Sequence, residues 1–199
     1  MNKFNKYTKA LIVVDMVNGF VNEGVLHDKN IKNILPKQII LIKQAIASSD
    51  TITIFLRDTH EKNSTELKRF GKIPHCIKDT SESQLVDELR IYEGVKNTVS
   101  IEKNSTSFME APDFRKMIKK LKNLKEAIVV GCCTDICIAN GTIGLANYLD
   151  QNNKDVDLYV YEDCIETYNS IEHPKDIYSK CAKVLMKQQG INFKKIGGE

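Results

Sequence analysis

Short runs of aliphatic and β-branched residues recur along this 199-residue chain and constrain its fold more than any other feature. The clearest are residues 10–14, 51–56 and 127–130, and such runs are typical of strands buried on both faces of a parallel sheet. Three further candidate strands lie at 97–101, 158–161 and 191–193.

Segments with helical apolar spacing separate these runs, at residues 36–47, 83–89, 114–124 and 138–149. Alternation of strand and helix predicts an α/β protein with three layers, α/β/α, around a central, mainly parallel sheet of about six strands. No linker or repeat divides the chain, so we expect residues 1–199 to form one domain.

Composition excludes several classes of function. The net charge is only +3, and the basic residues of the segment 114–124 lie opposite its apolar stripe without interleaved aromatic residues, so we expect no nucleic-acid partner. No apolar run is long enough for a membrane span, and the N-terminus lacks the pattern of a signal peptide, so we expect no membrane partner and a cytoplasmic location.

Three of the six cysteines crowd together in Gly-Cys-Cys-Thr-Asp-Ile-Cys, residues 131–137, between a predicted strand and a predicted helix. We expect Thr134 to cap the helix and Cys137 to lie in its first turn, where the helix dipole lowers the pKa of a thiol and free N–H groups can hold an oxyanion. Two alternatives are a buried, inert cysteine and a redox relay or zinc clip built from Cys132, Cys133 and Cys137.

Asp15 follows the first predicted strand directly, and a carboxylate buried there needs a partner. It could act as a base toward a thiol, or it could cap the following turn. Lys103 follows the strand candidate at 97–101, but by itself it resembles any solvated lysine.

A second set of side chains has the chemistry of metal ligands. Asp58 and His60 are two residues apart, so an extended chain places them on one face, and His75 adds a second imidazole. Glu66, in the polar segment between them, could add an oxygen ligand. One carboxylate with two imidazoles suits a single divalent ion, with zinc favoured over iron or manganese. For either histidine taken alone, an exposed loop position is the favoured interpretation. His27 and His173 have no carboxylate at ligand spacing and are expected on the surface.

Residues 13–20 and the Gly-x-x-Thr-Asp-x-Cys motif at 131–137 resemble the cysteine hydrolase (isochorismatase-like) superfamily, and within it the nicotinamidase/pyrazinamidase family. The resemblance covers nearly the whole chain. It implies the isochorismatase-like hydrolase fold and a catalytic triad of Asp15, Lys103 and Cys137. It also implies a small-molecule amide as substrate.

The same resemblance implies roles for residues around the triad. The metal ligands are Asp58, His60 and His75, with Glu66 as a further carboxylate, and Phe20 packs on the substrate ring. The backbone N–H groups of Cys133 and Cys137 form the oxyanion hole beside a cis peptide between Cys132 and Cys133. We also expect a homo-oligomer.

Two departures from the family pattern are Val17 and Gly19, where the family has Gln and Asp. Val17, together with the shifted spacing of the loop that carries Glu66, leaves open a related amidase that acts on another carbamoyl or ureido compound. A non-enzymatic thiol-based redox or metal-responsive interaction module is the remaining alternative.

Overall fold

A computed structural model describes residues 3–197 and contains a single six-stranded sheet in the order β3-β2-β1-β4-β5-β6, with every neighbouring pair parallel. The strands are β1 (Lys9–Val14), β2 (Thr51–Asp58), β3 (Thr98–Lys103), β4 (Glu126–Cys132), β5 (Asp157–Glu166) and β6 (Asn192–Lys194). The sequence therefore predicted all six strands, and the α/β class is confirmed.

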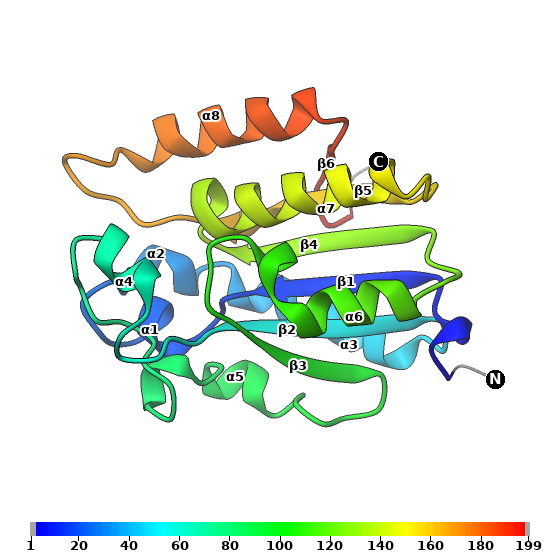
Figure 1. Cartoon of the computed structure of the whole chain (residues 1–199), viewed down its shortest axis with the longest axis horizontal. Coiled ribbons are helices and arrows are strands. Elements are labelled where there is room, and N and C mark those ends of the chain that lie inside the picture. The colour runs from blue at the N-terminus through cyan, green and yellow to red at the C-terminus, as the bar shows by residue number, and fades with distance from the viewer. Residues whose placement is uncertain (1–2, 198–199) are drawn as a thin grey trace.

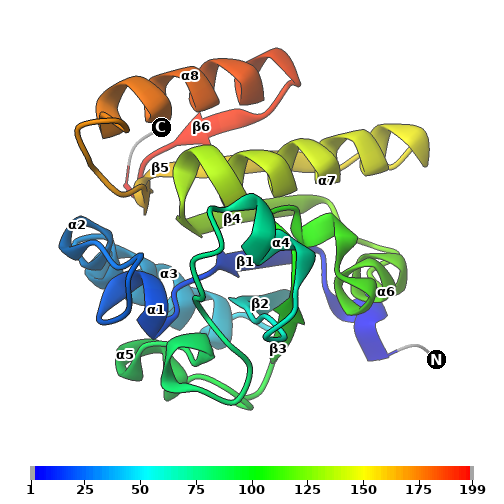
Figure 2. The same ribbon diagram turned by 60° about the vertical axis from the view of Figure 1, so that its left-hand side comes forward.

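Helices pack on both faces of the sheet (Figures 1 and 2). One hydrophobic core joins the sheet to the helices α6, α7 and α8, and the other joins it to α1, α2, α3 and α5. The helices are α1 (Asn18–Val21), α2 (Lys29–Lys32), α3 (Leu35–Ala47), α4 (Thr65–Arg69), α5 (Asp87–Arg90), α6 (Pro112–Lys120), α7 (Ala139–Gln151) and α8 (Lys175–Gln188). Four short helices precede or connect them: η1 (Lys3–Lys6), η2 (Ser81–Ser83), η3 (Phe108–Glu110) and η4 (Thr134–Ile138). No helix within residues 3–197 is long and apolar enough to cross a membrane.

The helix expected at 83–89 is largely wrong. Its first half is extended, because Leu85 forms a bridge with Val17 and Val86 donates its backbone N–H to Met16 O. Only α5 remains helical there, and Leu85, Val86 and Leu89 are buried against the second core. A buried loop therefore produces the same apolar spacing at 85, 86 and 89 as an amphipathic helix would.

The strand order reverses between β1 and β4, the position at which parallel α/β sheets open a crevice at their carboxyl edge. Gly131 makes this junction close: it pairs with Val14, its φ is +126°, and a Cβ on it would lie 2.0 Å from Val14 O. Only glycine fits both the conformation and the space. The segments that follow β1 and β4 therefore start next to each other.

Candidate active site

A buried lysine joins the carboxyl ends of three neighbouring strands. Lys103 ends β3, Asp58 ends β2 directly opposite it, and Asp15 follows β1. Lys103 Nζ lies 2.8 Å from Asp15 Oδ2 and 2.7 Å from Asp58 Oδ1, and all three side chains are almost completely buried. We call these three residues the lysine cluster. A lysine that by sequence resembled any solvated lysine is in fact the centre of a buried ion-pair network.

The electrostatics of the lysine cluster gives its two carboxylates different pKa values. Burial raises the pKa of Asp15 to about 7, because the attraction of Lys103 only partly offsets the loss of solvation. Burial also disfavours the charged form of Asp58, but the Lys103 ammonium and the His60 ring hold its pKa below the ordinary value. Asp58 is therefore a permanent anion, whereas Asp15 can exchange a proton near neutral pH.

The turn between β4 and α7 brings Cys137 to the lysine cluster. Cys137 is buried, and its Sγ lies 3.6 Å from Lys103 Nζ. It belongs to the π-helical turn η4, in which Cys133, and not Thr134, is the N-cap residue. Thr134 is the first residue of the turn and is buried, so the expected capping role is wrong. The structure nevertheless brings Asp15, Lys103 and Cys137 together.

The expected lowering of the Cys137 pKa is also wrong. Burial raises the pKa of this thiol well above its ordinary value, even though Lys103 favours the thiolate. Sequence reasoning considered only the N-terminal end of a helix, and desolvation outweighs that effect here. The resting group is therefore a thiol, and the carboxylate of Asp15 is among the charged groups that act on it.

The peptide between Cys132 and Cys133 is cis, as the sequence resemblance implied. Cys132 is fully buried, and its thiol donates a hydrogen bond to Asp15 O at 3.1 Å. This bond ties the segment after β1 to the segment after β4. Cys133 lines the adjacent cavity.

Two histidines lie next to the lysine cluster. His60 and His75 approach the Asp58 oxygen that does not contact Lys103. The ligand atoms of these two and of Asp58 all lie within 4.8 Å of one another, with His60 Nε2 at 2.8 Å and His75 Nε2 at 3.6 Å from Asp58 Oδ2. The other ring nitrogen of each histidine faces an oxygen acceptor, the Asn104 amide oxygen for His60 and Ile73 O, at 2.9 Å, for His75. With a proton held on each of those nitrogens, two lone pairs and a carboxylate oxygen point at one position, an arrangement that fits a divalent cation.

Glu66 lies on α4, at the rim of this group, and is half-buried. Burial and the Asp58 charge raise its pKa, and its Oε2 is buried without a hydrogen-bond partner among residues 3–197. Glu66 is not among the residues whose ligand atoms lie within 4.8 Å of one another. It is close enough to contribute negative charge to the group, and its role as a ligand stays a prediction.

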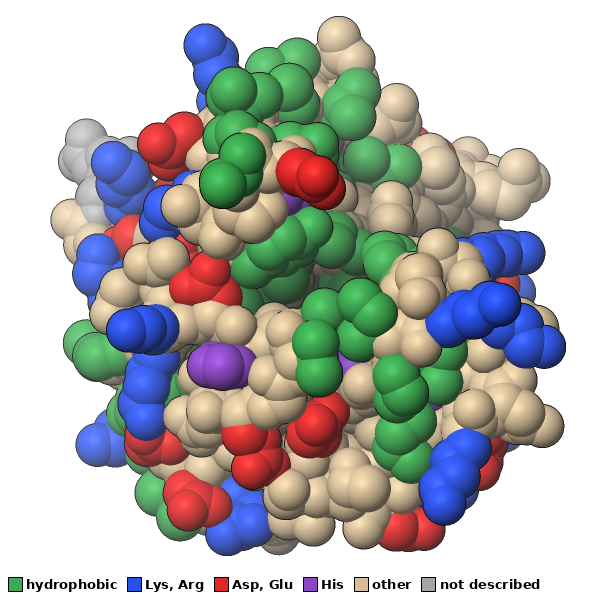
Figure 3. All heavy atoms as spheres, turned by 90° about the vertical axis from the view of Figure 1, so that its left-hand side faces the viewer, with side chains coloured by type: hydrophobic (Ala, Val, Ile, Leu, Met, Phe, Trp, Pro, Cys, Tyr) green, Lys and Arg blue, Asp and Glu red, His purple; other side chains and the backbone are tan. Residues whose placement is uncertain are grey.

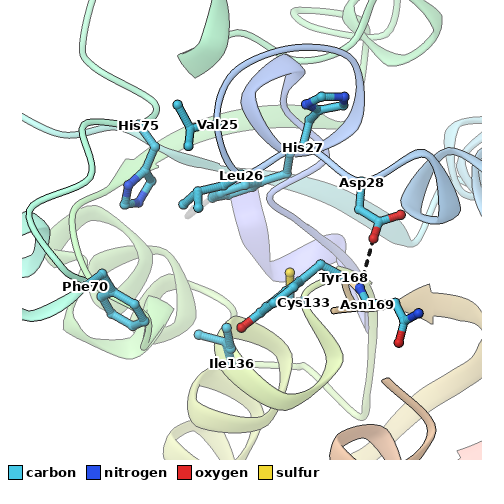
Figure 4. Close-up of a pocket in the computed structure, with 11 residues that line it drawn as sticks. Val25, Leu26, His27, Asp28, Phe70, His75, Cys133, Ile136, Tyr168 and Asn169 are labelled. Atoms are coloured by element: carbon cyan, nitrogen blue, oxygen red, sulfur yellow. Dashed lines mark hydrogen bonds between the residues drawn. The ribbon is translucent and has the colours of Figure 1, made fainter. Parts of the chain in front are cut away.

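An apolar cavity of about 360 Å³ opens beside these groups (Figures 3 and 4). Figure 3 looks onto the carboxyl edge of the sheet and shows a central hollow lined with hydrophobic side chains. His75, a member of the metal-ligand group, and Cys133, the residue before the turn with Cys137, both line this cavity. Phe20, predicted to contact substrate, lies in the wall with its ring centroid 5.9 Å from that of His75. The remaining wall is formed by Val25, Leu26, His27, Asp28, Phe70, Ile136, Tyr168 and Asn169.

The two departures from the family pattern have local causes. A Cβ on Gly19 would lie 2.8 Å from Cys76 Sγ and 3.1 Å from the Glu82 Cβ, so a larger side chain does not fit. Val17 is fully buried and belongs to the bridge with Leu85, where an apolar side chain completes the core. Neither residue lines the cavity. The departures therefore reflect packing of the loops beneath the site.

Sequence reasoning missed a second polar cluster. His173, expected on the surface, is only 6% exposed: its Nε2 lies 2.8 Å from Asp135 Oδ2, and its Nδ1 faces Tyr168 O at 3.1 Å. Thr167 donates its hydroxyl to the other oxygen of Asp135. We call Asp135, Thr167 and His173 the histidine clamp. The carboxylate partner lies 38 residues earlier in the chain, so local spacing gave no signal for it.

The histidine clamp also positions the cavity wall. The His173 ring stacks on Tyr168 with centroids 3.9 Å apart, and Tyr178 of α8 covers its other side at 3.8 Å. Tyr168 lines the cavity in Figure 4, and Asp135 belongs to the turn that carries Cys137. The clamp therefore holds the segment after β5 against that turn.

The order of these groups along the strands, and the thiol at a turn after β4, match the arrangement that the family resemblance implied. The chain belongs to the isochorismatase family, because residues 9–184 match the isochorismatase domain. Nicotinamidases and a pyrazinamidase are among the proteins that it resembles. Nicotinamidase 1 of Arabidopsis thaliana is 28% identical over 141 residues, which cover 65% of this chain and 56% of that protein.

Solved structures share the fold over nearly the full length. The nicotinamidase PncA of Bacillus subtilis superposes with a TM-score of 0.76 at 23% identity, covering 94% of this chain and 99% of that one. The pyrazinamidase of Pyrococcus horikoshii in complex with zinc gives 0.74 at 22% identity, with coverage of 94% and 99%. N-carbamoylsarcosine amidase of Thermoplasma acidophilum gives 0.73 at 20% identity, with coverage of 96% and 98%. The expected isochorismatase-like fold is thus confirmed.

Proposed function

We propose that this protein hydrolyses a small amide through a thioester on Cys137, and that nicotinamide is its substrate. The observation that carries the proposal is the position of Lys103, whose ammonium contacts the base Asp15, the anion Asp58 and the thiol of Cys137. One buried cation thereby holds the nucleophile, its base and a metal ligand in fixed relation beside an apolar cavity.

In the first half of the reaction, Asp15 accepts the proton of the Cys137 thiol and the sulfur attacks the amide carbonyl carbon. The backbone N–H groups of Cys133 and Cys137 stabilise the oxyanion that forms. Protonated Asp15 then gives its proton to the amide nitrogen as the C–N bond breaks, so ammonia leaves and an acyl thioester remains on Cys137. Lys103 offsets one of the two negative charges throughout: Asp58 stays ionised, and the second charge moves from Asp15 to the sulfur and back.

In the second half, a water molecule attacks the thioester while Asp15 takes its proton. The carboxylic acid leaves, and the proton returns to the sulfur, so the thiol and the ionised base are restored. Asp58, His60 and His75 would hold a divalent cation, with zinc as the favoured ion and Glu66 at the rim. Such an ion supplies a Lewis acid that can orient a ring nitrogen or lower the pKa of a bound water.

The shape and chemistry of the cavity favour an aromatic amide. Phe20, Phe70 and Tyr168 line it with aromatic side chains, and His75 belongs both to this lining and to the metal-ligand group, so a heteroaromatic nitrogen in the cavity could approach that group. A cavity of about 360 Å³ suits a single ring. The names of the relatives point in the same direction, since they include nicotinamidases and a pyrazinamidase.

The test is ammonia release from nicotinamide, pyrazinamide and N-carbamoylsarcosine by the metal-loaded protein. We expect turnover of the two aromatic amides, loss of turnover in Cys137→Ala, and little change in Cys164→Ala, a matched variant of another buried free cysteine. A trapped acyl adduct on Cys137, seen by mass spectrometry, would support the thioester. Turnover of N-carbamoylsarcosine alone would replace nicotinamide by a ureido substrate, and full activity of Cys137→Ala would overturn the covalent route.

A further inference from the structure

The peptide groups on both sides of Cys76 are held by groups outside its own turn. Its backbone N–H donates to Glu82 Oε2 at 2.9 Å, and its carbonyl oxygen accepts the backbone N–H of His60 at 2.9 Å. Cys76 directly follows His75, is fully buried, and has a φ of +45°, in the left-handed region that residues other than glycine rarely adopt. The two hydrogen bonds therefore hold a conformation that the chain by itself disfavours.

Glu82 belongs to η2 and also lies against two segments of the cavity wall. A Cβ on Gly24 would lie 2.8 Å from Glu82 Oε1, so the loop that continues into the cavity-lining residue Val25 passes directly over the carboxylate (Figure 4). A Cβ on Gly19 would lie 3.1 Å from Glu82 Cβ, so α1, which carries Phe20, packs closely on the same side chain. One half-buried glutamate thus contacts both the turn after His75 and the segments that form one wall of the cavity.

The backbone that carries Glu82 is anchored without the help of its side chain. Asn18, the first residue of α1, donates its backbone N–H to Gln84 O at 2.9 Å and its side-chain amide to Ser81 O at 3.1 Å. These bonds fix η2 to α1 on both sides of position 82. A substitution of Glu82 therefore removes the carboxylate from the turn after His75 while η2 stays in place.

We propose that Glu82 is a positioning residue for the divalent cation that the metal-ligand group would hold. By accepting the N–H of Cys76, its carboxylate sets the direction in which the chain leaves His75, and the carbonyl of the same residue sets the backbone of His60. Its contacts with α1 and the following loop keep the metal-ligand group at a fixed distance from the cavity wall. The inference rests on the metal ion of the proposed function and not on the identity of the amide, because Glu82 lies outside the cavity lining.

Zinc affinity, measured by competition with a colorimetric chelator, tests this role without reference to activity. We expect Glu82→Ala to weaken zinc binding by about 10-fold or more, the usual effect of removing a group that orients a metal ligand. Glu82→Gln keeps an oxygen that can accept the Cys76 N–H, so it should retain most of the affinity. The matched control is Glu88→Ala of α5, whose carboxylate is also partly exposed and pairs with Lys32 at 3.4 Å, and it should bind zinc like the wild type.

A spectroscopic measurement separates positioning from a loss of stability. Cobalt(II) bound in place of zinc gives visible absorption bands that depend on ligand geometry, and these bands should shift in Glu82→Ala but not in Glu88→Ala. If Glu82→Ala does not fold, Glu82→Asp shortens the side chain by one methylene and should show the same two changes. A wild type that binds no zinc, a Glu82→Ala variant with wild-type affinity and spectrum, or a Glu82→Gln variant as weak as Glu82→Ala would overturn the inference. Absence of amide hydrolysis with the expected zinc affinities would reject the proposed substrate alone.

Discussion

The lysine cluster and the histidine clamp both contact the turn that carries Cys137, yet they differ in how completely their charges are paired. In the clamp, each Asp135 oxygen has a partner, and both ring nitrogens of His173 face an acceptor. In the lysine cluster, two carboxylates share one cation, and Asp15 Oδ1 is buried without a hydrogen-bond partner among the residues that the structure describes.

The proposed chemistry uses the cluster whose charges are incompletely paired. A carboxylate with a free oxygen and a pKa of about 7 can take and return a proton, whereas one saturated by a hydroxyl and an imidazole is fixed in place. The surplus of negative charge around Lys103, from Asp15, Asp58 and Glu66, also favours an added cation. We therefore propose that the lysine cluster carries the chemistry and that the histidine clamp positions the cavity wall.

The largest expected effect comes from Lys103→Met. It leaves two buried carboxylates adjacent without a counter-ion, so we expect the free energy of unfolding to fall by about 3–5 kcal/mol and amide hydrolysis to fall by about 10³-fold or more. Urea denaturation and ammonia release measure the two quantities.

Lys175→Met is the matched control for this substitution. Lys175 also makes a 2.8 Å ion pair, with Glu166, but that pair is partly exposed, so its loss should cost at most about 1 kcal/mol. If Lys103→Met does not fold, Lys103→Arg keeps the charge and should fold with impaired hydrolysis. Equal effects of Lys103→Met and Lys175→Met would abolish the distinction between the clusters.

The next expected effect is on pH dependence. Asp15 must be ionised to take the thiol proton, and burial raises its pKa to about 7, so kcat/KM should fall about tenfold per pH unit below pH 7 and level off above it. Initial-rate measurements between pH 5 and pH 9 test this. Asp15→Asn should be nearly inactive, and its residual rate should lack the step at pH 7. A wild-type profile that is flat through pH 7 would remove Asp15 as the base.

A smaller effect, on metal content, should distinguish His60 of the metal-ligand group from His173 of the histidine clamp. His60→Ala removes one of the three converging ligand atoms, so we expect metal retained after dialysis to fall by about 10-fold or more. Elemental analysis of the purified protein measures it without reference to activity. Treatment of the wild type with a chelator should mimic the loss, and added zinc should reverse it.

His173→Ala is the matched variant in the histidine clamp. It should leave the metal content unchanged and lower the free energy of unfolding by about 1–3 kcal/mol, because Asp135 loses a buried partner. Activity should change mainly through KM, since Tyr168 of the cavity wall loses its stacked support. Loss of metal in His173→Ala would show that the clamp and the metal group are not separate.

The fold could be predicted from the sequence because strands buried on both faces leave a strong local signal. All six apolar runs became strands, and because neighbouring strands are parallel, Asp15 and Asp58 lie at one edge of the sheet, as expected of residues at strand ends. The segment 83–89 failed because apolar spacing does not separate a buried loop from a short helix. Helix boundaries near Cys137 failed because a π-helical turn and a cis peptide have no clear signal in residue types.

The site itself needed more than local pattern. The roles of Lys103 and Phe20 came only from the family resemblance, since neither is distinctive in its own segment. The direction of the Cys137 pKa depended on burial, which a helix-terminus argument omits. Asp135 and His173 are far apart in sequence, so only the folded chain places them in contact.

Gly131 has a consequence for how this protein can change over time. The strands bearing Asp15 and the Cys137 turn touch at a place where one methyl group would collide with Val14 O at 2.0 Å. A larger side chain at position 131 would push apart the segment with Asp15 and the turn with Cys137 in a single step, so small adjustments of the site cannot arise there. Variation in substrate has to arise at the cavity rim, in the loop from Val25 to Asp28 and at Phe70 and Tyr168, which can be rebuilt while the reacting groups stay in register. Because the contact at Gly131 is fixed, the residues at the cavity rim can vary without moving Asp15 or the Cys137 turn.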